Sequence, residues 1–380
     1  MTENTLFPEL LDRSFLLDPF PFYARMRRES PVAAVTEGGA FVAFSYGDAQ
    51  RVLSDYETFS SKVPFPPEMK DGIQSPIFMD PPKHKSVRAI VQQSFTRKRV
   101  EDMEPRITEL VHELIDAIEG RNGTDLMAAF TSPLPITVIA EILGVPVEDR
   151  KDFRRWSDGI ILNDQTAIRD LASYFRRLIE ERQGKSRDDL ISDLVTAHEA
   201  NGAALSEQEL VDFCILLLVA GNETTTNLIA NAVLSLDEHP EALERLRGDR
   251  SLVPSAIEET LRYRSPVQTT QRFSIAEVEL GGVRIPQGRG IQAHIGSANR
   301  DEARFEKPEE FRIDRQPNRH IAFGQGVHFC LGAPLARLEA KVALEALLER
   351  LPNLRVDPNA RLEPIPTWSI HGVTALPVLF

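Results

Sequence analysis

The most informative segment of the chain reads Phe323-Gly324-Gln325-Gly326-Val327-His328-Phe329-Cys330-Leu331-Gly332-Ala333-Pro334-Leu335-Ala336-Arg337. Its glycines permit a tight turn with positive φ, or the close approach of a flat partner to the backbone. Pro334 suits the first turn of a helix, so we expect a helix to begin directly after Cys330. Free backbone N–H groups and the helix dipole at such a terminus stabilise a thiolate and favour metal ligation.

Cysteine usage restricts the kind of metal site. The chain holds only two cysteines, Cys214 and Cys330, which excludes a disulfide framework and a four-cysteine site for zinc or an iron–sulfur cluster. Cys214 lies in the apolar run 213–219, where a buried and inert thiol is the ordinary interpretation. A single thiolate does not close a zinc site, whereas one thiolate beneath a flat porphyrin is a known arrangement for haem iron.

Residues 323–337 as a whole resemble the haem-binding signature of the bacterial cytochrome P-450 superfamily of haem-thiolate monooxygenases. The resemblance implies a mainly α fold with small β-sheets, in which haem b lies between a long central helix and the helix after the cysteine loop. It implies that Cys330 ligates the iron and that Phe323, Gly324 and Gly332 contact the haem. The implied reaction is hydroxylation of a small hydrophobic molecule with O2 and electrons derived from NAD(P)H.

A second match lies in the middle of a long apolar helix. Residues 220–225 are similar to the family's oxygen-activating stretch, and Ala220 and Thr224 are four apart, so they share a helix face. The resemblance implies that Ala220 and Gly221 leave room for O2 and that Thr224 and Glu223 serve in proton delivery. The alternative is that the Thr224 hydroxyl only bonds back to the Ala220 carbonyl.

A third match is the pair Glu259 and Arg262, which stand three residues apart and so face each other on a helix. Alone, such a pair is weak evidence, because most are solvated surface pairs. The pair resembles the family's Glu-x-x-Arg motif, which implies a buried triad with a second arginine from a later loop. Arg315 is the best match to that partner, and we expect the triad to hold the thiolate loop.

Haem carries two propionates, which need cationic partners. Residues 80–88 resemble the family's propionate-binding helix, in which His84 and Arg88 are four apart and point the same way. Arg272 and His328 resemble the other propionate ligands. Taken alone, His84 would be interpreted as an ordinary surface histidine.

The remaining pattern is that of one mixed domain over residues 1–380. Helical patterning dominates to about residue 262, with an apolar stripe over 101–118. A capping-box sequence at 206–209 predicts the start of the long helix, which we expect to reach about Leu236. The β-rich portions are expected at 31–45, 275–297 and 361–380. Within them we expect a hairpin around Gly38-Gly39 and one short strand each over 278–285 and 290–295.

Charge and composition restrict the partners. The net charge of −13 opposes binding to nucleic acid or to anionic membranes through bulk electrostatics. We find no signal-peptide pattern and no apolar run near the ~20 residues that a membrane span needs, so we expect a cytoplasmic protein.

The absence of flavin, iron–sulfur and nicotinamide-binding motifs predicts a separate ferredoxin and ferredoxin reductase. A basic docking patch is one interpretation of five cations, and a solvated charge run is the other: Arg97, Lys98, Arg99, Arg337 and Lys341.

The substrate pocket is the least determined part. Residues 62–78 are expected to form part of a lid, and residues 150–200 to vary freely around the pocket. The ligand classes are a steroid, terpenoid, fatty acid or polyketide. By analogy with the family, the residues near the substrate are Val219, Ala220, Val267, Gln268 and Ile370.

Three alternatives to a haem-thiolate hydroxylase stay open: a peroxide-using or isomerising relative, a non-catalytic haem protein, and a nucleophilic enzyme that uses Cys330 with His328.

Overall fold

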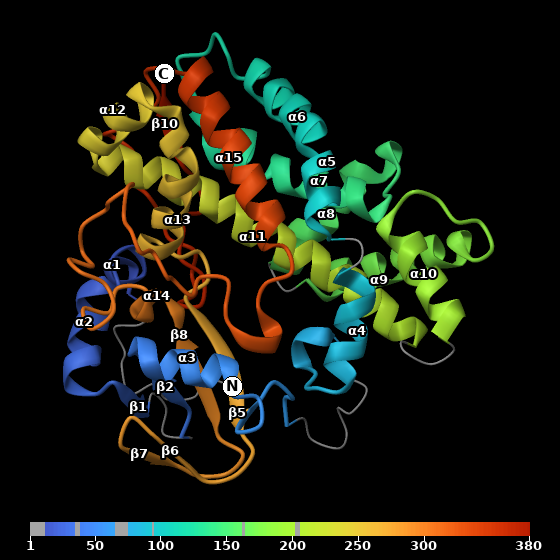
Figure 1. Ribbon diagram of the computed structural model, residues 1–380. Helices are drawn as coiled ribbons and strands as arrows, with labels where there is room; N and C mark the ends of the chain where they lie inside the picture. The colour runs from blue at the N-terminus through green and yellow to red at the C-terminus, as the bar shows by residue number, and fades with distance from the viewer. Residues whose placement is uncertain (1–11, 35–38, 65–74, 93–94, 162–163, 202–205) are drawn as a thin grey trace.

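The computed structural model describes residues 12–34, 39–64, 75–92, 95–161, 164–201 and 206–380. It is mainly helical with small sheets, which confirms the predicted fold class (Figure 1). The helices are α1 (Arg13–Leu17), α2 (Phe20–Glu29), α3 (Tyr46–Ser54), α4 (Lys83–Gln92), α5 (Arg97–Asp102), α6 (Glu104–Asp116), α7 (Pro133–Leu143), α8 (Arg150–Ile161), α9 (Gln165–Arg182), α10 (Leu190–Asn201), α11 (Glu207–Glu238), α12 (Pro240–Gly248), α13 (Val253–Tyr263), α14 (Ile295–Ala298) and α15 (Ala333–Arg350). The strands are β1 (Val32–Ala34), β2 (Phe41–Ala43), β3 (Phe59–Ser60), β4 (Gly123–Asp125), β5 (Thr269–Ser274), β6 (Val278–Leu280), β7 (Val283–Ile285), β8 (Gly290–His294), β9 (Arg355–Val356) and β10 (Pro377–Leu379).

The long helix α11 crosses the centre of the molecule and packs against α7, α9, α13 and α15 (Figure 1). Its start is the predicted capping box, because the Ser206 hydroxyl accepts the Glu209 N–H and the Glu209 carboxylate accepts the Ser206 N–H. The helix is long and apolar enough to cross a bilayer, but more than half of its most apolar stretch is buried within the protein. Its apolar surface is therefore used by the core of this fold.

The larger sheet has the strand order β1-β2-β8-β5-β3 and lies beside the helical part (Figure 1). The expected hairpin at 31–45 is present as antiparallel β1 and β2, with Val32 opposite Ala43; residues 35–38 lie outside the described chain. The sequence prediction missed β5, which pairs with β8 on one side and β3 on the other. The strand was missed because its buried side chains are the polar Arg272 and Ser274, so apolar and polar residues do not alternate along it.

Three further expectations need correction. Residues 278–285 form the hairpin β6 and β7 and not one strand, because Gly281 and Gly282 both take positive φ and turn the chain. The helical stripe over 101–118 is divided at Met103 into α5 and α6. In the tail from residue 361, only β10 forms a strand, together with isolated bridges.

The cysteine loop lies where the two parts of the fold meet. The loop leads directly into α15, which packs on α11, α13 and α6, while the turn at 326–328 contacts α3 beside the larger sheet. Both ends of the loop are thus attached to well-packed elements, which positions Cys330 at the junction.

Candidate active site

Cys330 stands on the wall of a cavity, directly before α15. Its N–H donates to the carbonyl of Phe323 at 2.9 Å, which closes the loop. The sulfur accepts the backbone N–H groups of Gly332 and Ala333, as expected at a helix start. Protein surroundings raise the pKa of the thiol, and these two hydrogen bonds act in the opposite direction. The loop therefore prepares the sulfur for a positively charged ligand such as a metal ion.

Glycine is required at two places in this loop. Gly324 and Gly326 take φ values of +70° and +71°, which side chains rarely adopt. A Cβ on Gly326 would also lie 2.9 Å from the Cα of Ser54 on α3. At Gly332 the nearest atom to such a Cβ is the Cys330 sulfur, at 4.0 Å, so this position is open toward the cavity.

The cavity has a volume of about 350 Å³. Ala220, Gly221 and Thr224 of α11 line it together with Cys330, so the predicted thiolate and the predicted oxygen-activating stretch share one space. A Cβ on Gly221 would meet Ile139 at an ordinary 3.6 Å, so Gly221 avoids no clash there. Phe323, Gly324 and Gly332 also line the cavity. Its apolar wall includes Ile77, Val87, Val91, Phe95, Ile139, Phe213, Leu216, Leu217, Val267 and Ile295.

Thr224 and Glu223 differ in how they face the cavity. The Thr224 hydroxyl donates to the Ala220 carbonyl at 2.7 Å, which is the alternative that the sequence left open. Its oxygen remains an acceptor on the cavity wall. Glu223 is not among the lining residues; burial raises the pKa of its carboxyl, which favours the protonated form.

Only two of the five residues expected near the substrate line the cavity, namely Ala220 and Val267. Val219 is the neighbour of Ala220 on α11 and points about 100° away around the helix. Gln268 is buried with its amide donating to the Ser265 carbonyl, and Ile370 forms a β-bridge with Val267 behind the wall. Most of the expected lid, residues 65–74, lies outside the described chain.

Four basic side chains gather at one end of the cavity: His84, Arg88, Arg272 and His328. The ring centroids of His84 and His328 are 4.0 Å apart, and Arg272 is buried, with side-chain hydrogen bonds among the described residues only to its own strand. Burial lowers the pKa of Arg272 to about 10, and burial together with His84 and Arg272 lowers the pKa of His328 to about 3. His84 Nδ1 is buried without a hydrogen-bond partner among the described residues. This end of the cavity is therefore suited to an anion.

The donor set fits haem. No three His, Cys, Asp or Glu side chains cluster in the described part of the chain, so a metal ion would have to come with its own ligands. The nearby Asp80 is already bonded to Ser60 and to the Ser61 N–H, and it leaves the basic cluster in need of negative charge. A flat group with an iron and two carboxylates matches a cavity that offers one thiolate and this basic cluster.

The predicted triad is assembled beside the loop. Glu259 is fully buried and accepts from Arg262 at 2.8 and 2.9 Å, and from Arg315 at 3.0 and 3.1 Å. Both guanidinium groups also donate to backbone carbonyls between residues 306 and 310. The triad therefore fastens the segment that leads into the cysteine loop onto α13.

The sequence analysis missed one acidic residue of the cavity. Glu339 on α15 lines the cavity with 2% of its surface exposed, and its Oε2 has no partner in the described chain. Burial raises its pKa to about 8. Its sequence context is that of an ordinary helical glutamate, so only the packing of α15 on α11 identifies it.

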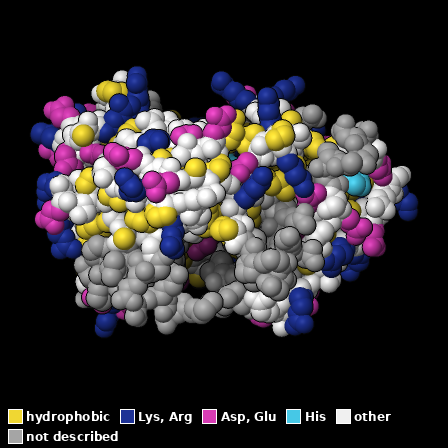
Figure 2. Space-filling model, turned by 90° about the horizontal axis from the view of Figure 1, so that it is seen from below, with side chains coloured by type: hydrophobic (Ala, Val, Ile, Leu, Met, Phe, Trp, Pro, Cys, Tyr) yellow, Lys and Arg dark blue, Asp and Glu magenta, His cyan; other side chains and the backbone are white. Residues whose placement is uncertain are grey.

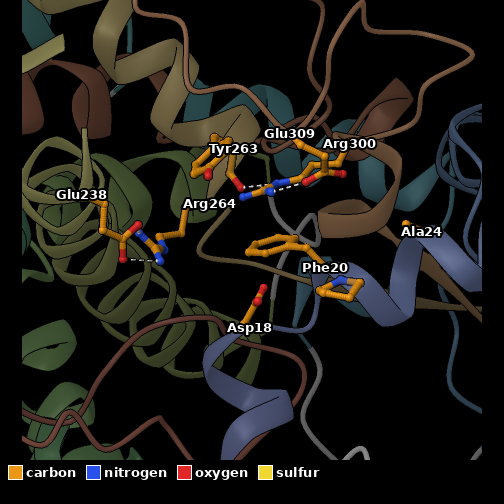
Figure 3. Close-up of a pocket in the computed structure, with 9 residues that line it drawn as sticks. Asp18, Phe20, Ala24, Glu238, Tyr263, Arg264, Arg300 and Glu309 are labelled. Carbon is orange, nitrogen blue, oxygen red and sulfur yellow. Dashed lines mark hydrogen bonds and ion pairs between the residues drawn. The ribbon is translucent and has the colours of Figure 1, made fainter. Parts of the chain in front are cut away.

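A second cavity of about 490 Å³ opens among α2, α11 and α13, away from Cys330 (Figure 3). Four of its five charged side chains are paired with one another, Arg264 with Glu238 and Arg300 with Glu309, and the fifth is Asp18. The Arg300 guanidinium lies between the rings of Phe20 and Tyr263, and its carbon is 3.4 and 3.6 Å from the two ring centroids. These contacts fasten α2 to α13, so we assign the cavity to the junction of these elements.

The expected basic patch is weaker than its sequence suggests. On the face of the molecule seen from below, lysine and arginine side chains are interspersed with aspartate and glutamate side chains (Figure 2). Four of the five cations are paired with carboxylates: Arg97 with Glu101, Arg99 with Asp193, Arg337 with Glu258, and Lys341 with Glu104.

Comparison with known proteins agrees with this geometry. Residues 161–379 match the family model described as Cytochrome P450. The chain is 42% identical to Cytochrome P450 109 of Bacillus spizizenii, over 97% of this chain and 94% of that protein. It is 37% identical to 6-deoxyerythronolide B hydroxylase of Saccharopolyspora erythraea, over 94% of each. The crystal structure of CYP109E1 from Bacillus megaterium in complex with testosterone superposes with a TM-score of 0.91 at 40% identity, covering 97% of this chain and 99% of that one. The chain therefore belongs to the cytochrome P450 family of haem-dependent monooxygenases.

Proposed function

We propose that this enzyme hydroxylates a neutral, hydrophobic molecule of steroid, terpenoid or polyketide size. The supporting observation is the cavity wall: apart from the cluster that would hold the haem propionates, the described lining offers no cation for a substrate carboxylate. An apolar wall without a charge partner disfavours a fatty-acid anion, because burying an unpaired carboxylate is costly. The relatives solved with testosterone, or named as hydroxylating 6-deoxyerythronolide B, are in keeping with this class.

We propose the following roles for the residues of the cavity, which the geometry supports. Cys330 would hold the iron of haem b, while His84, Arg88, Arg272 and His328 would hold its propionates. When bound, haem supplies the activation of O2 with NAD(P)H-derived electrons. Thr224 would orient a hydrogen bond at the cavity face of α11, and the raised pKa of Glu223 would let its carboxyl hold a proton beside it.

Electrons would come from a separate ferredoxin and its reductase, in the cytoplasm. Phe329 is 41% exposed and adjoins Cys330, so it offers a docking surface close to the proposed iron ligand. Because the nearby arginines and Lys341 are already paired, we expect charge to contribute less to docking than the sequence suggested.

Optical titration tests the substrate class. Substrate binding in the cavity of the haem-loaded enzyme would be read as a change in the iron spin state, and we expect this change with neutral steroids and with fatty-acid methyl esters. The free acid of the same chain length serves as the matched comparison and should bind at least tenfold more weakly. Tighter binding of the free acid than of its ester would refute the proposed class.

A further inference from the structure

Glu258, which directly precedes the triad residue Glu259, makes a second set of contacts to the cysteine loop. Its carboxylate accepts from Arg337 Nε at 2.6 Å and from Arg337 Nη2 at 2.9 Å. It also contacts His320 Nε2 at 3.0 Å. These contacts involve no member of the Glu259 triad, although the two glutamates are adjacent on α13.

The two partners of Glu258 stand on opposite sides of Cys330 in the sequence. His320 precedes the loop, and its Nδ1 accepts the Ala322 N–H at 3.2 Å, so the proton of the neutral ring is on Nε2 and is donated to Glu258. Arg337 follows the loop, within α15. One carboxylate on α13 therefore closes the base of the loop that carries the thiolate.

A short series of contacts leads from this carboxylate to the sulfur. The Arg337 guanidinium lies 4.5 Å from the centre of the Phe323 ring, a cation–π distance. The Phe323 carbonyl in turn accepts the Cys330 N–H at 2.9 Å. The position of Arg337 is thus coupled to both the ring that lines the cavity and the backbone of the ligand.

The same contacts set the charge near the sulfur. Arg337 is one of the cations that favour the Cys330 thiolate. Burial acts to raise the pKa of Glu258, but the hydrogen bonds from Arg337 and His320 hold it at about 2, so the carboxylate stays ionised at neutral pH. In the folded protein, Glu258 therefore offsets the positive charge of Arg337 beside the loop.

We propose that Glu258 is a positioning residue that fixes the cysteine loop through Arg337 and His320 and, by offsetting the charge of Arg337, lowers the reduction potential of the iron. The inference rests on the proposed role of Cys330 as the iron ligand. Glu258 contacts residues on both sides of the cysteine loop, whereas the Glu259 triad holds the segment that precedes the loop.

Two charge-removing variants of the haem-loaded enzyme make the test directional. Glu258→Gln leaves the Arg337 cation unopposed, so the ratio of reduced to oxidised iron at a fixed poised potential should rise at least about threefold. For a one-electron couple this equals about 30 mV, at 59 mV per tenfold change. Arg337→Gln should move the ratio in the opposite direction, and the double variant should return toward the parent value. A role limited to folding predicts no such reversal of sign.

Glu104→Gln is the matched control. It removes a carboxylate of α6 that pairs with Lys341, a cation on the same helix as Arg337, α15. A shift in Glu258→Gln no larger than in this control, or shifts of the same sign in both single variants, would overturn the inference. If Glu258→Gln fails to load haem, Arg337→Gln and the control still decide the sign. Failure of the parent enzyme to show the red-shifted thiolate band of its reduced carbon monoxide complex would instead refute the role of Cys330.

Discussion

Replacing Glu259 by Gln should destabilise the protein strongly, because two arginines would lose their buried counter-charge. Glu259, Arg262 and Arg315 are 0%, 0% and 6% exposed. The glutamine keeps the shape and one acceptor, but it leaves two cations without the carboxylate that offsets them. Breaking a buried pair in this way costs about 3–5 kcal/mol.

The corresponding change in melting temperature follows from the length of the chain. For 380 residues, the entropy of unfolding is about 0.8 kcal/mol/K, so we expect a decrease of about 4–6 °C. Calorimetry at one fixed scan rate on the haem-loaded protein measures it, since large proteins often unfold irreversibly.

A matched control lies next to Arg315. Asp314 pairs with Arg245 at 2.8 Å, but these side chains are 46% and 53% exposed. Asp314→Asn should therefore cost less than about 1 kcal/mol and lower the melting temperature by about 1 °C or less. If Glu259→Gln melts within 1 °C of the parent, or no lower than Asp314→Asn, the reasoning about the buried triad is wrong.

Two further predictions concern the cavity. Thr224→Ala should lower the amount of hydroxylated product formed per NAD(P)H consumed by about tenfold or more, because the hydroxyl on the cavity wall is lost. The control Thr137→Ala removes a similar hydroxyl bonded to a helix carbonyl of α7 and should leave this ratio unchanged. Equal ratios in the parent and both variants would exclude the role of Thr224. Burial raises the pKa of Glu339 from 4.5 to about 8, so the native state keeps a proton that the unfolded chain releases, and stability should fall as pH rises through this window by up to about 1.4 kcal/mol per unit. Urea midpoints at pH 5.5 and 7.5 should show a smaller decrease in Glu339→Gln, and an identical decrease in both proteins would contradict the assignment.

Much of the site is determined by local sequence. The glycines of the cysteine loop, the helix start after Cys330 and the capping box at Ser206 act over a few residues, so their patterns predict their structures. Fixed spacing on a helix likewise predicted that His84 and Arg88 share a face and that Glu259 meets Arg262. The family therefore followed from the sequence alone, and so did the proposal that Cys330 is the iron ligand.

Tertiary structure decided which side chains become buried and which charges meet. Glu339 and Glu258 have ordinary helical contexts. The packing of α15 on α11 buries Glu339, and the packing of α15 and of the segment before the cysteine loop on α13 gives Glu258 its two partners, Arg337 and His320. Tertiary contacts also pair Arg337 with a carboxylate, and a hydrogen bond to the Ser265 carbonyl holds the buried amide of Gln268, which does not line the cavity as expected. Burial and pairing depend on contacts between residues distant in the chain, and periodicity within one element carries no information about them.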